Sequence, residues 1–240
     1  MKPCNSWSRC APDVAITRTH VLLDLDGTLS DSEPGILRSL QWACEREGFP
    51  IPGDAEVRSV IGPPLEIGLP SIGIPDDALA RVINTYRDRY TRIGAFENTL
   101  YDGVIEMLDQ MAELGLSLSI ATAKPEQTAH PILDYFGISE RFDVRAGATL
   151  TSERRTKAQV IDFALRQLEI HADPDLGEHV IMVGDRNHDV QGAMHHGITC
   201  IGVTWGYGSI QELLTAGAVA LADSPAEVVE LVQQAYRLHD

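Results

Sequence analysis

Short apolar runs alternate with amphipathic helical patterns along most of the chain. The first run, residues 21–25, is apolar apart from Asp24 and leads into a turn at Gly27. Runs of this kind are typical of strands buried on both faces of a parallel sheet. Five similar runs follow, at residues 116–121, 142–146, 179–183, 199–203 and 219–222. Because helical patterns separate them, the chain predicts an α/β fold with a doubly wound, mostly parallel sheet and a Rossmann-like core.

One long segment breaks this alternation. Residues 34–100 hold no convincing strand pattern. A helical period runs over residues 36–48, and a second helix is expected at residues 76–92. A stretch rich in glycine and proline lies between them. The segment predicts an all-helical cap domain spliced into the core directly after the first strand.

The chain therefore divides into three expected parts. Residues 1–17 are polar and predict a flexible N-terminal tail. Residues 18–33 and 101–240 would together form the α/β catalytic core, and residues 34–100 would form the helical cap. We find no internal repeat that suggests another architecture.

Charge and composition narrow the class of partner. The chain has 240 residues, with 19 Lys and Arg against 35 Asp and Glu, so its formal net charge is −16. Nucleic acids and anionic membranes need a basic surface, which argues against both as partners. No apolar run approaches the roughly 20 residues of a membrane span. The four cysteines show no metal-binding spacing, which predicts free thiols in a cytoplasmic protein. The sequence does not determine the oligomeric state.

Candidate chemistry gathers where the predicted strands end. Asp24 and Asp26 end the first strand, and Asp185 and Asp189 follow the fourth. Ligands of open α/β sheets bind outside the carboxyl ends of the strands, so these four carboxylates are expected at one edge. Carboxylates without histidine or cysteine at ligand spacing suit a hard, oxygen-seeking ion such as Mg²⁺. The alternative for any single Asp is that it caps the following helix.

Hydroxyl and ammonium groups are expected at the same edge. Thr122 and Lys124 end the second strand, and Lys157 opens a helical pattern between the third and fourth. Taken alone, Thr122 could be a helix cap and either lysine a solvated surface residue. The order of all the groups along the chain, rather than any one of them, indicates a site.

That order resembles the motifs of the haloacid dehalogenase superfamily of phosphohydrolases: Asp-x-Asp-x-Thr, then Thr, then Lys, then Gly-Asp-x-x-x-Asp. The resemblance covers residues 18–240, and its motifs are highly specific when they occur together. A helical insertion between the first and second motifs is similar to the phosphoglycolate phosphatase-like branch. The resemblance implies a phosphoric monoester hydrolase that uses Mg²⁺ and acts on a small phosphorylated metabolite.

The resemblance to this family also implies roles for the acidic residues. Asp24 would be the nucleophile and a magnesium ligand. Asp26 would be the general acid and base, and its backbone carbonyl would bind the ion. Asp185 would be the further magnesium ligand, Asp189 would be a ligand or lie just outside, and Thr28 would support the loop.

The remaining motif residues would bind the phosphoryl group. The resemblance assigns this to Thr122, Ala123 and Lys157, and Lys157 would also hold the nucleophile. Lys124 and Arg186 are expected to support the site and to supply local positive charge, which a chain at −16 needs to attract an anion. Ala123 and Arg186 depart from the family pattern, which often has Asn and a small hydroxyl residue there.

The cap would select the leaving group, with Gly62, Pro63 and Pro64 as the expected substrate-facing loop; a plain turn between helices is the alternative. Asp26 favours a phosphatase over a dehalogenase, because an alkoxide needs an acid and a halide does not. The reaction expected is hydrolysis through an aspartyl-phosphate. Phosphoglycolate is the first candidate substrate, and a 5′-nucleotide or another sugar or organic phosphate is the alternative. A phosphomutase and a catalytically silent interaction protein are weaker alternatives.

Overall fold

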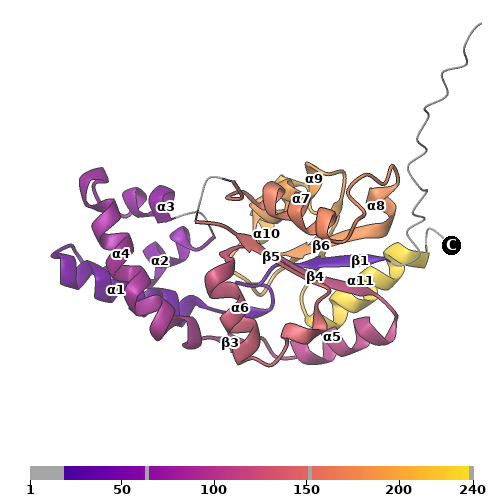
Figure 1. The fold of residues 1–240 in the computed structure, drawn as a ribbon, viewed down its shortest axis with the longest axis horizontal. Coiled ribbons are helices and arrows are strands. Elements are labelled where there is room, and N and C mark those ends of the chain that lie inside the picture. Colours follow the sequence, from indigo (N-terminus) through magenta and orange to yellow (C-terminus); the bar gives the residue numbers. More distant parts are fainter. Residues whose placement is uncertain (1–18, 63–64, 151–152, 238–240) are drawn as a thin grey trace, which may run out of the picture.

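The structure is a computed structural model and describes residues 19–62, 65–150 and 153–237. Its centre is a six-stranded parallel sheet in the order β5-β4-β1-β6-β7-β8 (Figure 1). The strands are β1 (His20–Leu23), β4 (Ser117–Pro125), β5 (Val144–Ala148), β6 (Val180–Gly184), β7 (Thr199–Val203) and β8 (Ala220–Ala222). The chain order reverses at β1, which lies between β4 and β6. This confirms the predicted doubly wound α/β fold.

Helices cover both faces of the sheet (Figure 1). One face carries α7 (Lys157–Gln167), α8 (Leu176–His179), α9 (Asn187–Met194) and α10 (Ile210–Ala216). The other carries α5 (Val104–Glu113), α6 (Glu126–Tyr135), the short 3₁₀ helix η2 (Ser139–Arg141) and α11 (Pro225–Arg237). All six predicted strands are present within a few residues of their expected bounds.

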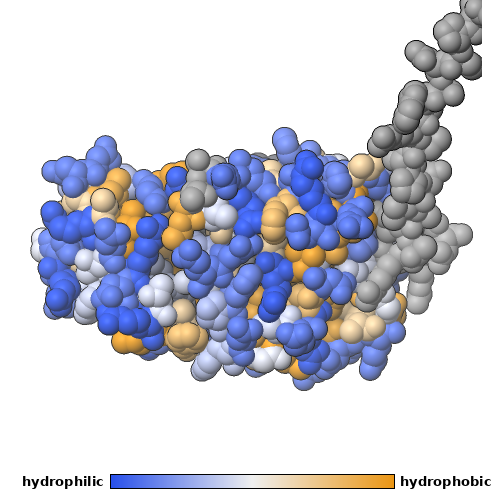
Figure 2. Space-filling model, in the orientation of Figure 1, coloured by the Kyte–Doolittle hydropathy of each residue, from blue (hydrophilic) through white to orange (hydrophobic). Residues whose placement is uncertain are grey.

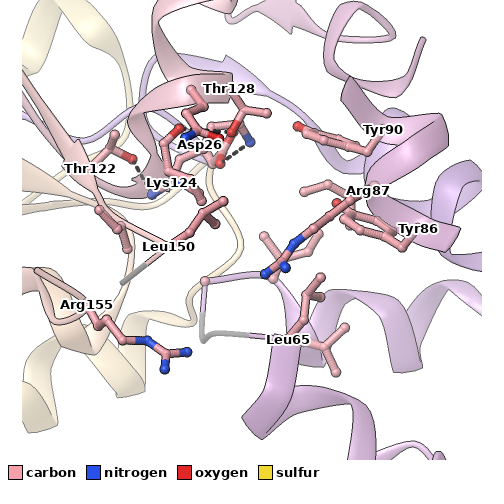
Figure 3. Close-up of a pocket in the computed structure, with 18 of the residues that line it drawn as sticks. Asp26, Leu65, Tyr86, Arg87, Tyr90, Thr122, Lys124, Thr128, Leu150 and Arg155 are labelled. Carbon is pink, nitrogen blue, oxygen red and sulfur yellow. Dashed lines mark hydrogen bonds and ion pairs between the residues drawn. The ribbon is translucent and has the colours of Figure 1, made fainter. Parts of the chain in front are cut away.

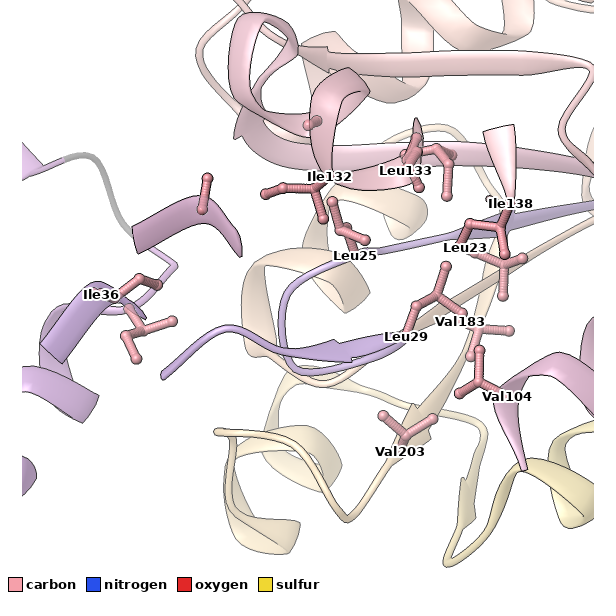
Figure 4. Packing of buried hydrophobic residues seen from close by; sticks show 14 of the residues in the cluster. Leu23, Leu25, Leu29, Ile36, Val104, Ile132, Leu133, Ile138, Val183 and Val203 are labelled. Carbon is pink, nitrogen blue, oxygen red and sulfur yellow. The ribbon is translucent and has the colours of Figure 1, made fainter. Parts of the chain in front are cut away.

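The central strand explains why its sequence is apolar without alternation. Leu22 belongs to the hydrophobic cluster under α7 and α9, whereas Val21 and Leu23 belong to the cluster on the opposite face. Successive side chains of a strand point to opposite faces, so a strand covered on both faces needs apolar residues throughout. Figure 4 shows Leu23 packed near Leu133 and Ile138, in the same hydrophobic cluster as Val21.

The inserted segment forms a separate helical layer beside the core (Figure 1). It comprises α1 (Glu33–Glu47), α2 (Asp54–Val60), α3 (Leu65–Ser71), α4 (Asp76–Arg92) and the short 3₁₀ helix η1 (Gly94–Phe96). Where it joins the core, β2 (Ser30–Asp31) pairs antiparallel with β3 (Thr99–Leu100). The inserted all-helical cap of the predicted fold class is confirmed, and its exact boundaries stay a prediction.

The sequence pattern missed four elements of this segment: α2, α3, η1 and β3. Helices α2 and α3 lie in the stretch rich in glycine and proline, and β3 lies where no strand was expected. Pro70 lies in the last turn of α3 and cannot donate the backbone hydrogen bond that a helical residue there would make, so it weakens only the end of the helix. Gly68 lets α3 approach α2, since a Cβ there would come within 2.9 Å of Val60 Cβ. Close packing, rather than local propensity, therefore builds this part of the cap.

Residues 1–17, Pro63 and Pro64, for which we predicted a flexible tail and part of a loop, lie outside the described residues. Within the described ranges, none of the helices combines the length and apolar character needed to cross a lipid bilayer. The visible face in Figure 2 is largely hydrophilic, and its apolar side chains form scattered patches.

Candidate active site

The end of β1 brings the first motif against the end of β6. The Asp24 backbone N–H donates to the Val183 carbonyl at 3.0 Å, which extends the pairing of the two strands. The chain then turns sharply, and Gly27 adopts a φ of +81°. A Cβ at Gly27 would lie 2.3 Å from Asp185 Oδ2, so this backbone packs directly against that carboxylate. Glycine is required here for both reasons.

Asp185 is fully buried and is surrounded by neutral hydrogen-bond donors. Its Oδ2 accepts from the Tyr207 backbone N–H at 2.7 Å, and its Oδ1 accepts from Thr28 Oγ1 at 3.3 Å. Within the described residues, no Lys, Arg or His forms an ion pair with it. Burial, followed by the charges of Asp189 and Asp24, raises the pKa of Asp185 well above its ordinary value.

Lys157 is the cation that holds the centre of the site. Its buried Nζ lies 2.9 Å from Asp24 Oδ1 and 2.7 Å from Asp189 Oδ1, and it donates to the Ala121 carbonyl at 2.8 Å. Burial opposes its charge, but Asp189 and Asp24 outweigh that effect and raise the pKa of Lys157. Lys157 is the first residue of α7, where a positive charge is unfavourable for the helix dipole. The two carboxylates therefore account for its position.

The same contacts distinguish the two carboxylates. Burial raises the pKa of Asp24, and Lys157 only partly offsets this. Burial also opposes ionisation of Asp189, but Lys157, His188 and backbone donation from Arg186 outweigh it, so the pKa of Asp189 is lowered. Asp189 Oδ2 accepts from the Arg186 N–H at 2.9 Å and thus also caps α9. The capping alternative therefore holds for Asp189, which at the same time pairs with Lys157.

Asp26, Thr122 and Lys124 form the next part of the site. Lys124 Nζ donates to Asp26 Oδ2 at 2.6 Å and lies 5.0 Å from the centre of the Tyr90 ring. Thr122 is buried at the end of β4, and its Oγ1 accepts from the Lys124 backbone N–H at 3.2 Å. Asp26 is thus held by a cation that has little freedom to move.

Arg186 connects the core to the cap. Its Nε lies 2.9 Å from Glu212 Oε1, and its Nη1 donates to the carbonyl of Ile61 at the end of α2. Gly62 packs on the same region, since a Cβ there would lie 2.9 Å from His188 Cε1. The cap loop is therefore anchored over the end of β6.

A cavity of about 490 Å³ opens between the sheet edge and the cap (Figure 3). Most of the predicted site residues line it: Asp24, Asp26, Gly62, Thr122, Ala123, Lys124 and Arg186. Thr28, Lys157, Asp185 and Asp189 do not line it and lie behind its floor, buried in the core. The predicted residues thus divide into a set that lines the cavity and a buried set that lies behind it.

Sequence reasoning missed much of the opposite wall. The cap supplies Leu65, Tyr86, Arg87 and Tyr90, and the core adds Leu150 (Figure 3). Tyr86 and Tyr90 are four residues apart on α4 and stack with ring centres 5.2 Å apart. Their spacing is that of an ordinary helix core face, so only the tertiary structure shows that they face a cavity. His188 was likewise missed because it follows no metal-ligand spacing.

The residues present fit the predicted divalent ion. The donors are carboxylate oxygens, and Asp185 is a fully buried carboxylate with no cationic partner among the described side chains. A buried charge of this kind needs a cation or a proton. Ligand atoms of Asp24, His188 and Asp189 also lie within 4.8 Å of one another. Lys157 already binds Asp24 and Asp189 there, so the unmatched negative charge lies towards Asp185.

Comparison with known proteins agrees with this geometry. The family model described as haloacid dehalogenase-like hydrolase matches residues 21–203, so the chain belongs to this family. The match spans most of the α/β core and the whole helical insertion. Several relatives within reach of this family carry the names of phosphatases.

The relatives carry different names. The chain is 40% identical over 188 residues to the tyrosine-protein kinase PtkA of Mycobacterium tuberculosis, a match covering 78% of this chain but 62% of that protein. It is 37% identical to a 5′-nucleotidase of Pseudomonas aeruginosa, over 84% of this chain and 89% of that one. A phosphoglycolate phosphatase of Yersinia pestis is 30% identical over 82% and 85% of the two chains.

A solved structure shows the same fold. The crystal structure titled as a predicted phosphatase from Clostridium acetobutylicum superposes with a TM-score of 0.83 and 33% identity. The superposition covers 90% of this chain and 99% of that chain. The arrangement of core and cap is therefore shared along almost the whole of that chain.

Removing the Lys157 charge should strongly destabilise the protein. In Lys157→Met, the carboxylates of Asp24 and Asp189 remain buried without their cation, so we expect the free energy of unfolding to fall by about 3–5 kcal/mol. Urea denaturation in the presence of a chelator measures this. Arg166→Met, which breaks the exposed pair with Asp162, is the matched control and should leave stability near that of the wild type. Equal effects of the two substitutions would contradict the assigned role.

Proposed function

We propose that this protein hydrolyses a phosphate monoester through an aspartyl-phosphate, with Asp24 as the nucleophile and Asp26 as the general acid and base. The observation that carries the proposal is the pairing of these two carboxylates with separate lysines at one cavity. Asp24 is held by Lys157 at 2.9 Å and Asp26 by Lys124 at 2.6 Å. Two carboxylates in different surroundings can perform different tasks.

The proposed reaction has two steps. A carboxylate oxygen of Asp24 attacks phosphorus, the bond to the leaving-group oxygen breaks, and Asp26 gives that oxygen its proton. Asp26 then accepts a proton from a water molecule that attacks the aspartyl-phosphate, which releases phosphate and regenerates Asp24. Positioned acid and base groups contribute about 10²–10⁴ to the rate. The Lys124 ammonium would orient Asp26 for both transfers.

The phosphoryl group needs donors for its developing charge. Thr122 would donate its hydroxyl, and the backbone beside Ala123 would contribute at the same strand end. Lys157 would keep Asp24 in place and offset negative charge from behind the cavity floor. These groups are fixed before the substrate arrives, so little reorganisation would accompany the reaction.

A divalent ion would be held by Asp24, Asp185 and the backbone carbonyl of Asp26. When bound, it would reduce the repulsion between a carboxylate nucleophile and a phosphate dianion. The oxygen donors favour Mg²⁺. Asp185 supports this assignment, because its burial without a cationic partner among the described residues is costly unless a cation joins it.

The cavity favours a leaving group larger than glycolate. At about 490 Å³ it falls within the range of roughly 300–1,000 Å³ that suits drug-sized ligands. Part of its wall is apolar and aromatic, with Leu65, Tyr86 and Leu150 (Figure 3). A 5′-nucleotide matches both the size and the stacking surface, and the similarity to a 5′-nucleotidase supports it. Phosphoglycolate is the second candidate, supported by the phosphoglycolate phosphatase relatives.

The Tyr90 hydroxyl provides further support for a polar ligand in this cavity. Tyr90 is 4% exposed, and its hydroxyl has no hydrogen-bond partner among the described residues. A buried unpaired hydroxyl is rare in native proteins. Figure 3 shows it directed towards the Asp26 and Lys124 pair. It would donate to, or accept from, a polar atom of the leaving group.

Replacement of the nucleophile tests the proposal directly. Asp24→Asn should abolish phosphate release from 5′-nucleotides, phosphoglycolate and p-nitrophenyl phosphate, because an amide cannot form the acyl phosphate. Phosphate release across this panel, with Mg²⁺ present, is the measurement. Asp109→Asn, an exposed acid of α5, should keep wild-type activity. Activity in Asp24→Asn, or a wild-type protein inert to the whole panel, would refute the mechanism.

Metal binding has its own test, independent of activity. Mg²⁺ should raise the melting temperature of the wild type, because binding to the folded state stabilises it. Asp185→Asn should lose this shift and, with chelator present, should be at least as stable as the wild type, since a buried repulsive charge is gone. Asp102→Asn, an exposed loop residue, serves as the control. An unchanged Mg²⁺ shift in Asp185→Asn would exclude this ligand.

The Tyr90 hydroxyl can be removed without its ring. Tyr90→Phe should leave the melting temperature unchanged or slightly higher, because the hydroxyl is unpaired, while kcat/KM for the best 5′-nucleotide falls about tenfold. Thermal unfolding and steady-state kinetics give the two readouts. Tyr135→Phe, on the exposed side of α6, is the control. A loss of stability with unchanged kinetics would show that the hydroxyl is structural.

A further inference from the structure

Two arginines converge in the outer part of the cavity. Arg87 comes from α4 of the cap, and Arg155 comes from the core segment before α7. Figure 3 shows their guanidinium groups directed towards each other across the cavity. Glu66 of α3 lies between them: Arg87 Nη2 is 3.4 Å from Glu66 Oε1, and Arg155 Nη2 is 3.2 Å from Glu66 Oε2.

The charges of this group do not balance. Two guanidinium groups share one carboxylate, which leaves one positive charge in excess. The neighbouring Asp88 also lines the cavity, but it pairs with Arg92. By contrast, the other basic side chains of the wall that form ion pairs, Lys124 and Arg186, each pair with a carboxylate of their own. The excess charge is therefore local to the outer end of the cavity.

Glu66 holds its partners weakly. The side chains of Arg87, Glu66 and Arg155 are 40%, 41% and 44% exposed, so water screens both ion pairs. Each guanidinium carries five donors in a planar fork that matches a carboxylate or phosphate, and Glu66 engages one nitrogen of each. An anion entering the cavity can therefore replace Glu66 at low cost.

We propose that Arg87 and Arg155 form an anion subsite for the far end of the substrate, and that Glu66 occupies it when the cavity is empty. The inference rests on the proposed phosphatase function and narrows its substrate class. The preferred substrates are phosphate monoesters whose leaving group ends in a carboxylate or a second phosphate. A 5′-nucleotide, whose leaving group ends in a neutral base, would fit the cavity but leave this subsite unfilled. The reacting phosphate lies at Asp24, and the second anion lies at the opposite end of the cavity.

A simple latch between cap and core would use the same contacts, but it predicts the opposite effect of a substitution. If Glu66 only ties the cap to the core, Glu66→Gln weakens the closed form and lowers kcat/KM for every substrate. If Glu66 competes with the substrate anion, Glu66→Gln raises kcat/KM for substrates that carry that anion. The sign of the change separates the two.

The experiment uses ω-phosphooxy carboxylates of increasing chain length, beginning with phosphoglycolate, each beside its methyl ester. The readout is the ratio of kcat/KM between acid and ester. A parallel set of α,ω-diol bisphosphates against the matching monophosphates shows whether a second phosphate replaces the carboxylate. Arg81→Gln and Glu47→Gln are the matched controls, because this ion pair between α4 and α1 does not line the cavity.

We expect the acid-to-ester ratio to exceed one at the chain length that spans the cavity. Arg87→Gln and Arg155→Gln should each lower that ratio about tenfold, the effect of losing a hydrogen bond to a charged group. Glu66→Gln should raise it, and the two control variants should leave it at the wild-type value.

A ratio near one at every chain length, or a lower ratio in Glu66→Gln, would overturn the subsite. These results are separable from failure of the proposed function. Hydrolysis of acids and esters alike would preserve the phosphatase and remove the subsite. No phosphate release from either series, with release from a 5′-nucleotide, would likewise remove only the subsite, and no release from any of these compounds would remove both.

Discussion

The position of one buried ammonium group determines the arrangement of the whole site. Lys157 Nζ lies within 2.9 Å of carboxylate oxygens from the end of β1 and from α9, and it also binds a carbonyl of β4. Three separate elements are thereby fixed around one charge. Without it, two carboxylates would face each other in an environment where unpaired charges are very costly. Asp24, the proposed nucleophile, is therefore held by an interaction that lies behind the cavity rather than inside it.

The site also requires glycine where the backbone approaches the buried carboxylates closely. Gly27, Gly184 and Gly206 each lie where a Cβ would come within 2.5 Å of an atom of Asp185 or Asp189. These close contacts leave no room for a side chain beside the carboxylates of Asp185 and Asp189, which are both fully buried. The turn that follows β7 contributes in the same way, since Tyr207 donates its N–H to Asp185 and its hydroxyl to Asp31 beside the cap. Tyr207 thus forms hydrogen bonds both to the buried carboxylate of the site and to the segment where the cap begins.

The core and the cap have separate tasks in this arrangement. The core supplies the groups proposed for phosphoryl transfer, and the chain belongs to a family whose members carry different names. The cap supplies the wall that would contact the leaving group, with Tyr90 near the reacting end and Arg87 at the outer end. Substrate preference can therefore change through the cap while the chemistry of the core stays the same.

The sequence alone determined the sheet, because fully buried strands must be apolar throughout and their ends must carry the polar groups. It also placed Asp24, Asp26, Thr122, Lys124 and Lys157 together, since the carboxyl ends of parallel strands share one edge. Only the tertiary structure shows which residues of the cap line the cavity. Tyr86 and Tyr90 follow the spacing of an ordinary core face, and Arg87, Glu66 and Arg155 come from three separate segments. Their convergence depends on how the cap packs against the core, which no local pattern records.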